Sequence, residues 1–225
     1  MLISLLDYLA RRSGGKVSVV VATTGDTGPA AISAAAHLSS TQIVVAYPLG
    51  QVSRMQELQM TTEQAENVKV FAFEGGGDDM DAPIKALSTD SGFQRKHGLT
   101  SVNSINIGRI LTQTVHYFWS YLRAIEKKNL EIGAPLQFAL PCGALGNATA
   151  GLMAKLMGLP VSNILCGTND NDIFHRAVAL GDFSRADCMV RTLSEAINIQ
   201  VPYNFERMLY LLRSRTLLPP PALPL

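Results

Sequence analysis

The sequence predicts an α/β fold built on parallel β-sheets in two lobes, and three observations support this prediction. Short apolar segments alternate with helical segments along the chain, which is typical of parallel strands joined by crossover helices. The first of these segments, residues 16–22 (KVSVVVA), is rich in β-branched valine and nearly continuous in apolar character, as expected of a strand covered on both faces. Two further segments, residues 23–28 and 141–147, place glycines between a strand and a helix.

The expected elements follow one another in a regular order. Strands are expected at residues 16–22, 42–47, 68–73, 99–103, 136–140 and 163–166. Helices are expected at residues 2–12, 29–38, 54–62, 79–88, 107–128, 148–157, 173–180 and 205–213.

The order of these elements predicts a small α/β lobe at residues 1–118 and part of a larger α/β lobe at residues 119–213. A proline-rich tail at residues 214–225 follows, because four prolines in its last segment cannot continue the preceding helix. An extended terminal segment and a read-through or alternatively spliced end both explain this tail.

Composition and charge exclude several classes of function. The 225 residues carry 19 Lys and Arg against 18 Asp and Glu, so the net charge of +1 would attract neither nucleic acid nor an anionic membrane. No segment reaches the roughly 18 uninterrupted apolar residues of a membrane-spanning helix, and the N-terminus lacks the basic segment of a signal peptide. Three cysteines without a C-x-x-C pair and four scattered histidines predict neither a disulfide framework nor a metal site. We therefore expect a cytoplasmic or organelle-matrix protein without nucleic-acid, membrane or metal partners.

The loop at residues 23–28 (TTGDTG) is the first candidate binding site. Its glycines let the backbone approach a ligand, and the unpaired N–H groups at the start of the next helix favour a carboxylate or a phosphate. A plain strand-to-helix turn capped by Asp26 and Thr27 explains the same sequence equally well. The loop consists of Thr23, Thr24, Gly25, Asp26, Thr27 and Gly28.

Residues 141–147 (PCGALGN) repeat the pattern of strand, glycine-bearing loop and helix. No Lys-Ser or Lys-Thr follows the glycines, so this loop is not a nucleoside-triphosphate P-loop, and the chain contains no G-x-G-x-x-G. A phosphate cradle of backbone amides and a tight turn both fit the pattern.

Two more polar segments follow strand ends. Residues 101–109 (SVNSINIGR) combine Asn103 and Ser104 with Arg109, and a guanidinium binds phosphate through a two-pronged contact; a capped helix with an exposed arginine is the alternative. In residues 167–172 (GTNDND), helix capping explains most of the polar side chains, since the glycine and the glutamate of a calcium loop are absent.

These four loops in order, together with residues 55–62 (MQELQMTT), resemble the threonine synthase family, most closely its threonine synthase-like 2 branch. The resemblance covers residues 1–213. It implies the two-lobed fold of the tryptophan-synthase-β (fold type II) pyridoxal-phosphate enzymes, incomplete at both ends. Threonine synthases act on O-phosphohomoserine, and the synthase-like relatives resemble phospho-lyases of O-phosphohomoserine or O-phosphothreonine. The implied partner is therefore a phosphorylated small amino acid.

The resemblance also implies a role for each loop. Residues 23–28 match the loop that grips the substrate carboxylate, with Asp26 near the hydroxyl of the cofactor ring. Asn103, Ser104 and Arg109 match the clamp for the substrate's phosphate. Cys142 stands where the synthases usually have serine or threonine, and a thiol is the weaker hydrogen-bond donor. The loop that cradles the phosphate of pyridoxal phosphate is matched by Gly143, Ala144, Leu145, Gly146 and Asn147.

The cofactor lysine is the largest departure from the family. Its members hold pyridoxal phosphate as a Schiff base on a lysine in an F-K-D motif, at the head of a helix that corresponds here to residues 2–12. None of the lysines of this chain lies in such a motif: Lys16, Lys69, Lys85, Lys96, Lys127, Lys128 and Lys155.

In the family this lysine also moves the proton at the substrate Cα, so we expect weak or absent cofactor binding and no turnover from the chain as it stands. Two alternatives stay open. One is a non-catalytic interaction form or secreted signalling form of the same gene. The other is a binding domain for small phosphorylated metabolites.

Overall fold

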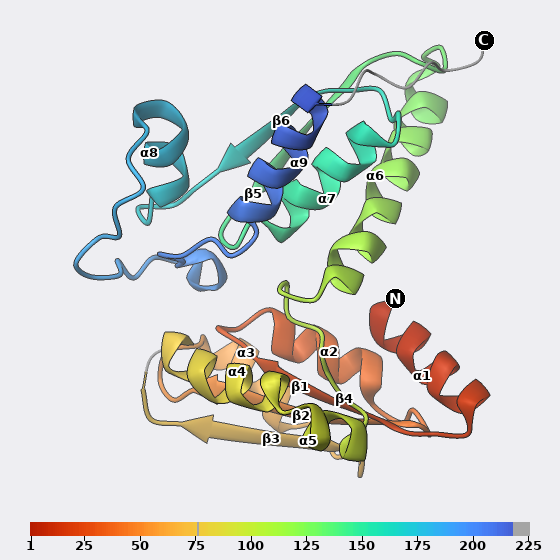
Figure 1. Ribbon diagram of the computed structural model, residues 1–225, viewed down its shortest axis with the longest axis vertical. Coiled ribbons are helices and arrows are strands. Elements are labelled where there is room, and N and C mark those ends of the chain that lie inside the picture. The colour runs from red at the N-terminus through yellow and green to blue at the C-terminus, as the bar shows by residue number, and fades with distance from the viewer. Residues whose placement is uncertain (76, 218–225) are drawn as a thin grey trace. The chain divides into compact units, whose positions relative to one another are not determined.

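The computed structural model describes residues 1–75 and 77–217, which form two compact units (Figure 1). Residues 1–108 with 193–196 make the first unit, and the second contains the rest of the described chain. The main segment of the first unit ends at Gly108, and helix α6 (Ile107–Lys128) runs unbroken and packs its buried side chains within the second unit. The expected tail lies outside the described residues from position 218 onward.

The first unit is built on a four-stranded parallel sheet in the order β3-β2-β1-β4, which confirms the predicted parallel arrangement. Val19 and Val21 on the central strand are fully buried, as the run of β-branched residues predicted. In the register, Val19 pairs with Ile43 on one side and with Thr100 on the other. The strands are β1 (Val17–Ala22), β2 (Thr41–Pro48), β3 (Val68–Phe73) and β4 (Leu99–Ser101).

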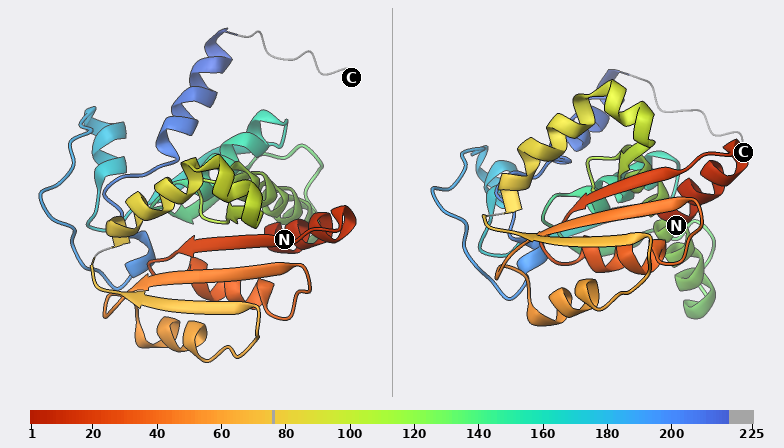
Figure 2. Two further views of the ribbon diagram at one scale, coloured as in Figure 1. Left: turned by 60° about the horizontal axis from the view of Figure 1, so that its bottom comes forward. Right: turned by 90° about the horizontal axis from the view of Figure 1, so that it is seen from below.

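Helices cover both faces of this sheet. Figure 2 shows α4 and α5 on one face and α2 and α3 on the other. The sequence pattern did not predict α5, which is fixed by its ends: Asp90 caps it by accepting from the N–H of Phe93 at 2.9 Å, and Gly98 closes it in the left-handed region. The helical elements are α1 (Leu2–Ser13), α2 (Thr27–Ala35), α3 (Arg54–Thr61), η1 (Gly77–Met80), α4 (Asp81–Thr89) and α5 (Ser91–His97).

The second unit packs helices around a parallel pair of strands. The long helix α6 buries Tyr117 and Tyr121 against Ala150 and Ala154 of α7, and the small side chains let the two helices approach. Helix α7 begins at Gly146, earlier than expected, and α9 continues to Leu217. Its further elements are β5 (Leu136–Pro141), α7 (Gly146–Leu156), β6 (Val161–Gly167), α8 (Ile173–Leu180) and α9 (Phe205–Leu217), while η2 (Glu195–Ile197) lies where the chain passes from the first unit back to the second.

Candidate functional site

A buried threonine shapes the loop that follows β1. The Thr23 hydroxyl accepts hydrogen bonds from the backbone N–H of Gly25 at 3.1 Å and of Gly28 at 3.0 Å. Asp26 occupies the N-cap position of α2, but its side chain makes no capping bond. The plain-turn explanation named Asp26 and Thr27 as caps. Its Asp26 part is wrong, and the Thr23 hydroxyl binds the amides of the turn instead.

The second contact of this loop comes from α3. Gly25 has a φ of +136°, and a Cβ added to it would lie 2.5 Å from the side-chain amide of Gln56. The Nε2 of Gln56 donates to Oδ1 of Asp26 at 2.7 Å. Gln56 is held in turn by the reciprocal capping box that it makes with Ser53. Sequence reasoning gave Gln56 no role, although the S-x-x-Q spacing of a capping box was visible.

Asn103 connects the third loop to the first. Its Nδ2 donates to the carbonyl of Ala22 at 2.6 Å, and its Oδ1 accepts from the N–H of Ala22 at 3.3 Å. Ser101 supports this side chain by donating to the same Oδ1 at 3.0 Å. The structure thus brings Asn103 next to the start of the Thr23–Gly28 loop, and Ser104 follows it half-buried.

The start of α6 is fixed by another asparagine. Asn106 donates to the carbonyl of Ser101 at 2.6 Å and accepts from the N–H of Gly108 at 2.8 Å. Arg109, in the first turn of α6, belongs to the second unit. Burial lowers the pKa of its guanidinium from the ordinary value, so part of the hydration of this cation is lost. A desolvated guanidinium is suited to pair with an anion.

In the second unit, the loop after β5 leads directly into α7. Leu145 is buried with a φ of +61° at the N-cap position, and no side chain caps the helix there. The amide and the hydroxyl of Thr149 donate to the Leu145 carbonyl at 2.9 and 2.8 Å. The amides of residues 146–148 precede this first helical bond, so the helix itself offers them no acceptor.

Two buried side chains fix this loop by hydrogen bonds to its backbone. Asn204, which is fully buried, donates from Nδ2 to the carbonyl of Ala144 at 2.8 Å. The hydroxyl of Tyr117 donates toward the carbonyl and Oδ1 of Asn147, both 2.9 Å away. Burial raises the pKa of Tyr117, so this hydroxyl stays protonated as a donor. Neither supporting residue stood out in the sequence, because each is far from the loop along the chain.

The loop fits a phosphate group by its composition and its backbone. Residues 142–148 (CGALGNA) contain no acidic side chain, and α7 lacks a competing cap. Gly143 is required by packing, since a Cβ there would lie 2.9 Å from the side chain of Ile199 and 3.0 Å from the Cα of Ile197. The first turn of α7 could therefore hold the phosphate of a cofactor such as pyridoxal phosphate.

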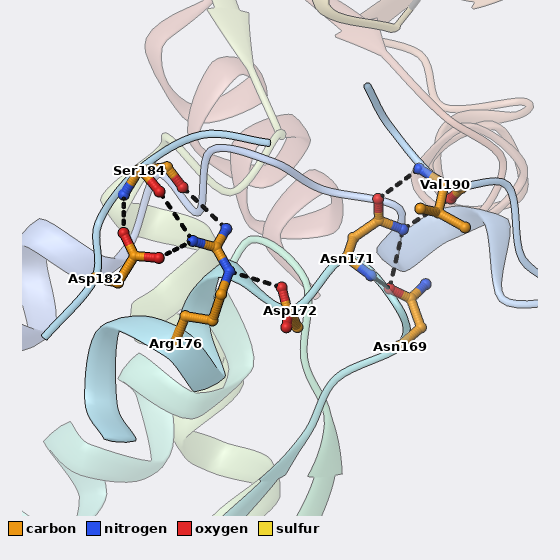
Figure 3. Close-up of polar contacts among 7 residues, drawn as sticks. All are labelled: Asn169, Asn171, Asp172, Arg176, Asp182, Ser184 and Val190. Atoms are coloured by element: carbon orange, nitrogen blue, oxygen red, sulfur yellow. Dashed lines mark hydrogen bonds and ion pairs between the residues drawn. The ribbon is translucent and has the colours of Figure 1, made fainter. Parts of the chain in front are cut away.

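The polar segment 167–172 forms a hydrogen-bonded network, not a cap (Figure 3). Asn171 exchanges two bonds with the backbone of Val190, at 2.8 and 2.9 Å. Asp172 makes no capping bond to α8 and instead accepts from Nε of Arg176 at 2.9 Å. The capping explanation is therefore wrong for Asp172, and the segment ties β6 to the long connection after α8.

The predicted site residues divide between the two units. Thr23, Asp26 and Asn103 lie in the first unit, and Arg109 and the 143–147 loop lie in the second. Within residues 1–75 and 77–217, no group of three or more His, Cys, Asp or Glu side chains is placed to hold a metal ion. No helix in the same part of the chain is both long enough and apolar enough to cross a bilayer.

The chain is similar in sequence to several threonine synthases and threonine synthase-like proteins. Threonine synthase-like 2 of Rattus norvegicus is 44% identical over 207 residues, which are 92% of this chain and 42% of that protein. Threonine synthase of Saccharomyces cerevisiae is 37% identical over 217 residues, 93% of this chain and 42% of that protein. No family model matches the chain.

Solved structures give the same result. The pyridoxal-phosphate-bound threonine synthase of Brucella melitensis superposes with a TM-score of 0.80 at 36% identity, covering 95% of this chain and 45% of that one. Threonine synthase of Escherichia coli superposes with a TM-score of 0.82 at 32% identity, covering 96% of this chain and 49% of that one. The chain spans less than half the length of each of these four relatives.

The parallel sheets and the two strand-to-helix loops match the fold of the fold-type II threonine synthases with which the chain superposes. This confirms the fold class expected from the sequence. The chain is a homologue of the threonine synthases and of the threonine synthase-like 2 proteins, as the order of its loops predicted.

Proposed function

We propose that this chain supplies the substrate-binding and cofactor-phosphate-binding segments of a phospho-lyase or threonine synthase that acts on O-phosphohomoserine or O-phosphothreonine. The observation that carries the proposal is the uncapped first turn of α7. Asn204 and Tyr117 fix this turn by donating hydrogen bonds to the carbonyls of Ala144 and Asn147. The backbone N–H groups of this turn can donate hydrogen bonds to the phosphate of pyridoxal phosphate, and the similar solved structures include a pyridoxal-phosphate-bound threonine synthase.

The other loops serve the substrate in this proposal. The Thr23 hydroxyl binds the amides of Gly25 and Gly28 within the turn and so orients the start of α2, where the positive end of the helix dipole favours the substrate's carboxylate. Asn103 fixes the position of that turn through Ala22, and Arg109 supplies a cation for the substrate's phosphate. When bound, pyridoxal phosphate supplies the electron sink for chemistry at Cα, while the protein orients the reactants.

The phosphate cradle is tested by comparing pyridoxal phosphate with pyridoxal in titration calorimetry on the 225-residue chain. We expect the phosphorylated compound to bind at least about tenfold more tightly, a difference of roughly 1.4 kcal/mol. Asn147→Asp places a carboxylate in the first turn of α7 and should remove this preference. Asn163→Asp, at an exposed position of β6, should keep it. Equal affinities for the two compounds would overturn the assignment.

The substrate clamp is tested at Arg109. Arg109→Ala should weaken binding of O-phosphohomoserine more than binding of homoserine, because only the former carries the phosphate. Equal losses for both compounds would rule out the clamp.

The expected lack of a cofactor lysine is tested by borohydride reduction in the presence of pyridoxal phosphate. No cofactor should stay attached at an active-site lysine of this chain, and a stoichiometric adduct on one lysine would contradict the expectation.

A binding domain for small phosphorylated metabolites is the second candidate, because the first turn of α7 would recognise the phosphate and not the ring. It predicts that simple phosphate esters bind as tightly as pyridoxal phosphate in the same titration. The proposal of a cofactor cradle predicts that they bind more weakly.

A further inference from the structure

Asn204 joins helix α9 to the loop that leads into α7. The residue is fully buried, and its carbonyl accepts from the N–H of Met208 at 3.1 Å, so it stands at the start of α9. Two of its donors reach the same acceptor: the backbone N lies 3.2 Å and Nδ2 lies 2.8 Å from the carbonyl oxygen of Ala144. A single residue therefore sets the direction of the Ala144 carbonyl.

Arg207, in the first turn of α9, fixes the orientation of this carboxamide. Its Nη1 donates to Oδ1 of Asn204 at 2.6 Å. The two ends of a carboxamide are similar in shape, but one accepts and the other donates hydrogen bonds. The cationic donor on Oδ1 keeps that oxygen on the side of Arg207 and Nδ2 on the side of Ala144. If the carboxamide turned over, its oxygen would face the oxygen of Ala144 without a proton between them.

The direction of the Ala144 carbonyl decides where the next amide points. No cis peptide bond occurs among the described residues, and in a trans peptide the C=O and the following N–H point to opposite sides. Since the Ala144 carbonyl points to Asn204, the N–H of Leu145 points away from it. The amide of Leu145 is thereby added to those of residues 146–148, which precede the first helical bond of α7.

The contact between α7 and α9 does not depend on Arg207 alone. The hydroxyl of Thr149, on α7, lies 3.4 Å from the carbonyl oxygen of Asn204. Phe205 and Met208 of α9 pack against the apolar residues at the start of α7. We therefore expect a substitution at Arg207 to leave the two helices packed together.

We propose that Arg207 is a positioning residue for a phosphate bound at the first turn of α7. Through Oδ1 of Asn204, its guanidinium keeps the Ala144 carbonyl directed toward α9, which leaves the Leu145 amide to donate to the phosphate. The inference rests on the proposed function, because it names the residue that orders the amides of that same site. Arg207 acts through Asn204, so its effect belongs to the affinity for the phosphate group and not to the affinity for the ring.

Titration calorimetry of pyridoxal phosphate and of pyridoxal on the full 225-residue chain tests this role through the ratio of the two affinities. Arg207→Ala should lower the ratio by about threefold or more, because a charge-assisted bond no longer orders the cradle. The affinity for pyridoxal should stay unchanged. Arg207→Lys keeps a cationic donor and should retain most of the ratio. Arg213→Ala, at an exposed arginine of the same helix, is the matched control and should retain all of it.

The pattern across the variants separates positioning from a general structural role. Equal losses of affinity for both compounds in Arg207→Ala, or a loss in Arg207→Lys as large as that in Arg207→Ala, would overturn the inference. If the unmodified chain prefers pyridoxal phosphate and Arg207→Ala keeps the same ratio, the inference fails while the proposed function stands. If the unmodified chain shows no preference, the proposed function fails and the inference falls with it.

The amide of Leu145 provides a second readout, by proton–nitrogen correlation spectra of the labelled chain. In the unmodified chain its resonance should shift on addition of pyridoxal phosphate and should move little with pyridoxal. In Arg207→Ala the phosphate-dependent shift should become clearly smaller. A Leu145 resonance that responds alike to both compounds in the unmodified chain would refute the inference, and this outcome decides even if Arg207→Ala does not fold.

Discussion

The carboxamide of Asn103 forms hydrogen bonds with both backbone polar groups of Ala22, the last residue of β1. Strand β4, the neighbour of β1, ends at Ser101, so no backbone amide of β4 continues the ladder this far. A carboxamide carries a donor and an acceptor arranged as in a peptide group. The side chain of Asn103 can therefore replace the missing backbone partner of Ala22. This contact sets the position from which the Thr23–Gly28 loop departs.

Replacing Asn103 with alanine should destabilise the first unit. Two hydrogen bonds to Ala22 are lost, and at about 1 kcal/mol each we expect a loss of roughly 2 kcal/mol in the free energy of unfolding. Urea denaturation followed by circular dichroism measures this change. Asn163→Ala, at an exposed position of β6, is the control and should stay within about 0.5 kcal/mol of the unmodified chain. A loss at Asn103 no larger than at Asn163 would contradict the role of the contact.

Gly25 should tolerate alanine far less well than Gly14. At Gly25 the φ of +136° strains any L residue, and the added Cβ would displace Gln56 from Asp26, for a combined cost of about 2–4 kcal/mol. Gly14 has a φ of +68° and no atom within 4 Å of an added Cβ, so only about 1–2 kcal/mol is expected there. Urea denaturation of the two variants compares these costs directly. Similar losses at both glycines would show that Gln56 does not constrain the loop.

The hydroxyl of Tyr117 should make stability depend on pH in the alkaline range. Its pKa is raised in the folded protein above the ordinary value of 10.0, first by burial. Its contribution to stability is therefore complete below pH 10 and is lost as the pH rises beyond that value, because the unfolded chain ionises first.

Tyr117→Phe should lower the free energy of unfolding at pH 7 by about 1 kcal/mol through loss of the bonds to Asn147. It should also flatten the decline above pH 10, measured by denaturant titrations across this range. Tyr8→Phe, at a half-exposed tyrosine on α1, should leave both the stability and its pH dependence almost unchanged. An unaltered alkaline slope in Tyr117→Phe would contradict the assignment.

Asp182 should contribute to acid sensitivity of the second unit. Hydrogen bonds from Ser184 and the Arg176 guanidinium lower its pKa to about 2 (Figure 3). The stabilisation is present above the ordinary value of 3.8 and is lost as the pH falls toward 2, because the unfolded chain then binds the proton more readily.

Asp182→Asn should therefore reduce the fall in stability between about pH 4 and pH 2, measured by urea denaturation at each pH. Asp187→Asn, at an exposed carboxylate of the same connection, is the matched control. If both variants follow the unmodified chain throughout this range, the contact of Asp182 with Arg176 carries no linked stability.

The sequence indicated the loops of the candidate site but not the side chains that hold them. The glycines at 25 and 143 marked both loops, because only a few residue types suit a tight strand-to-helix connection. The side chains that hold these loops, Gln56 and Asn204, come from distant segments, and their polarity alone is compatible with many surface roles. Their burial and their partners exist only after the chain has folded.

The alternation of apolar strands with helices determined that this chain forms parallel α/β units. The spacing of apolar residues reflects the local preference for strand or helix, and the folded chain keeps that preference. The sequence likewise determined the loop order that marks its homology to the threonine synthases. The tertiary structure alone decided that Thr23, rather than Asp26, holds the first turn and that Asn103 replaces a strand partner of Ala22. Hydrogen bonds between residues far apart in sequence depend on which elements pack together, and no local pattern encodes that choice.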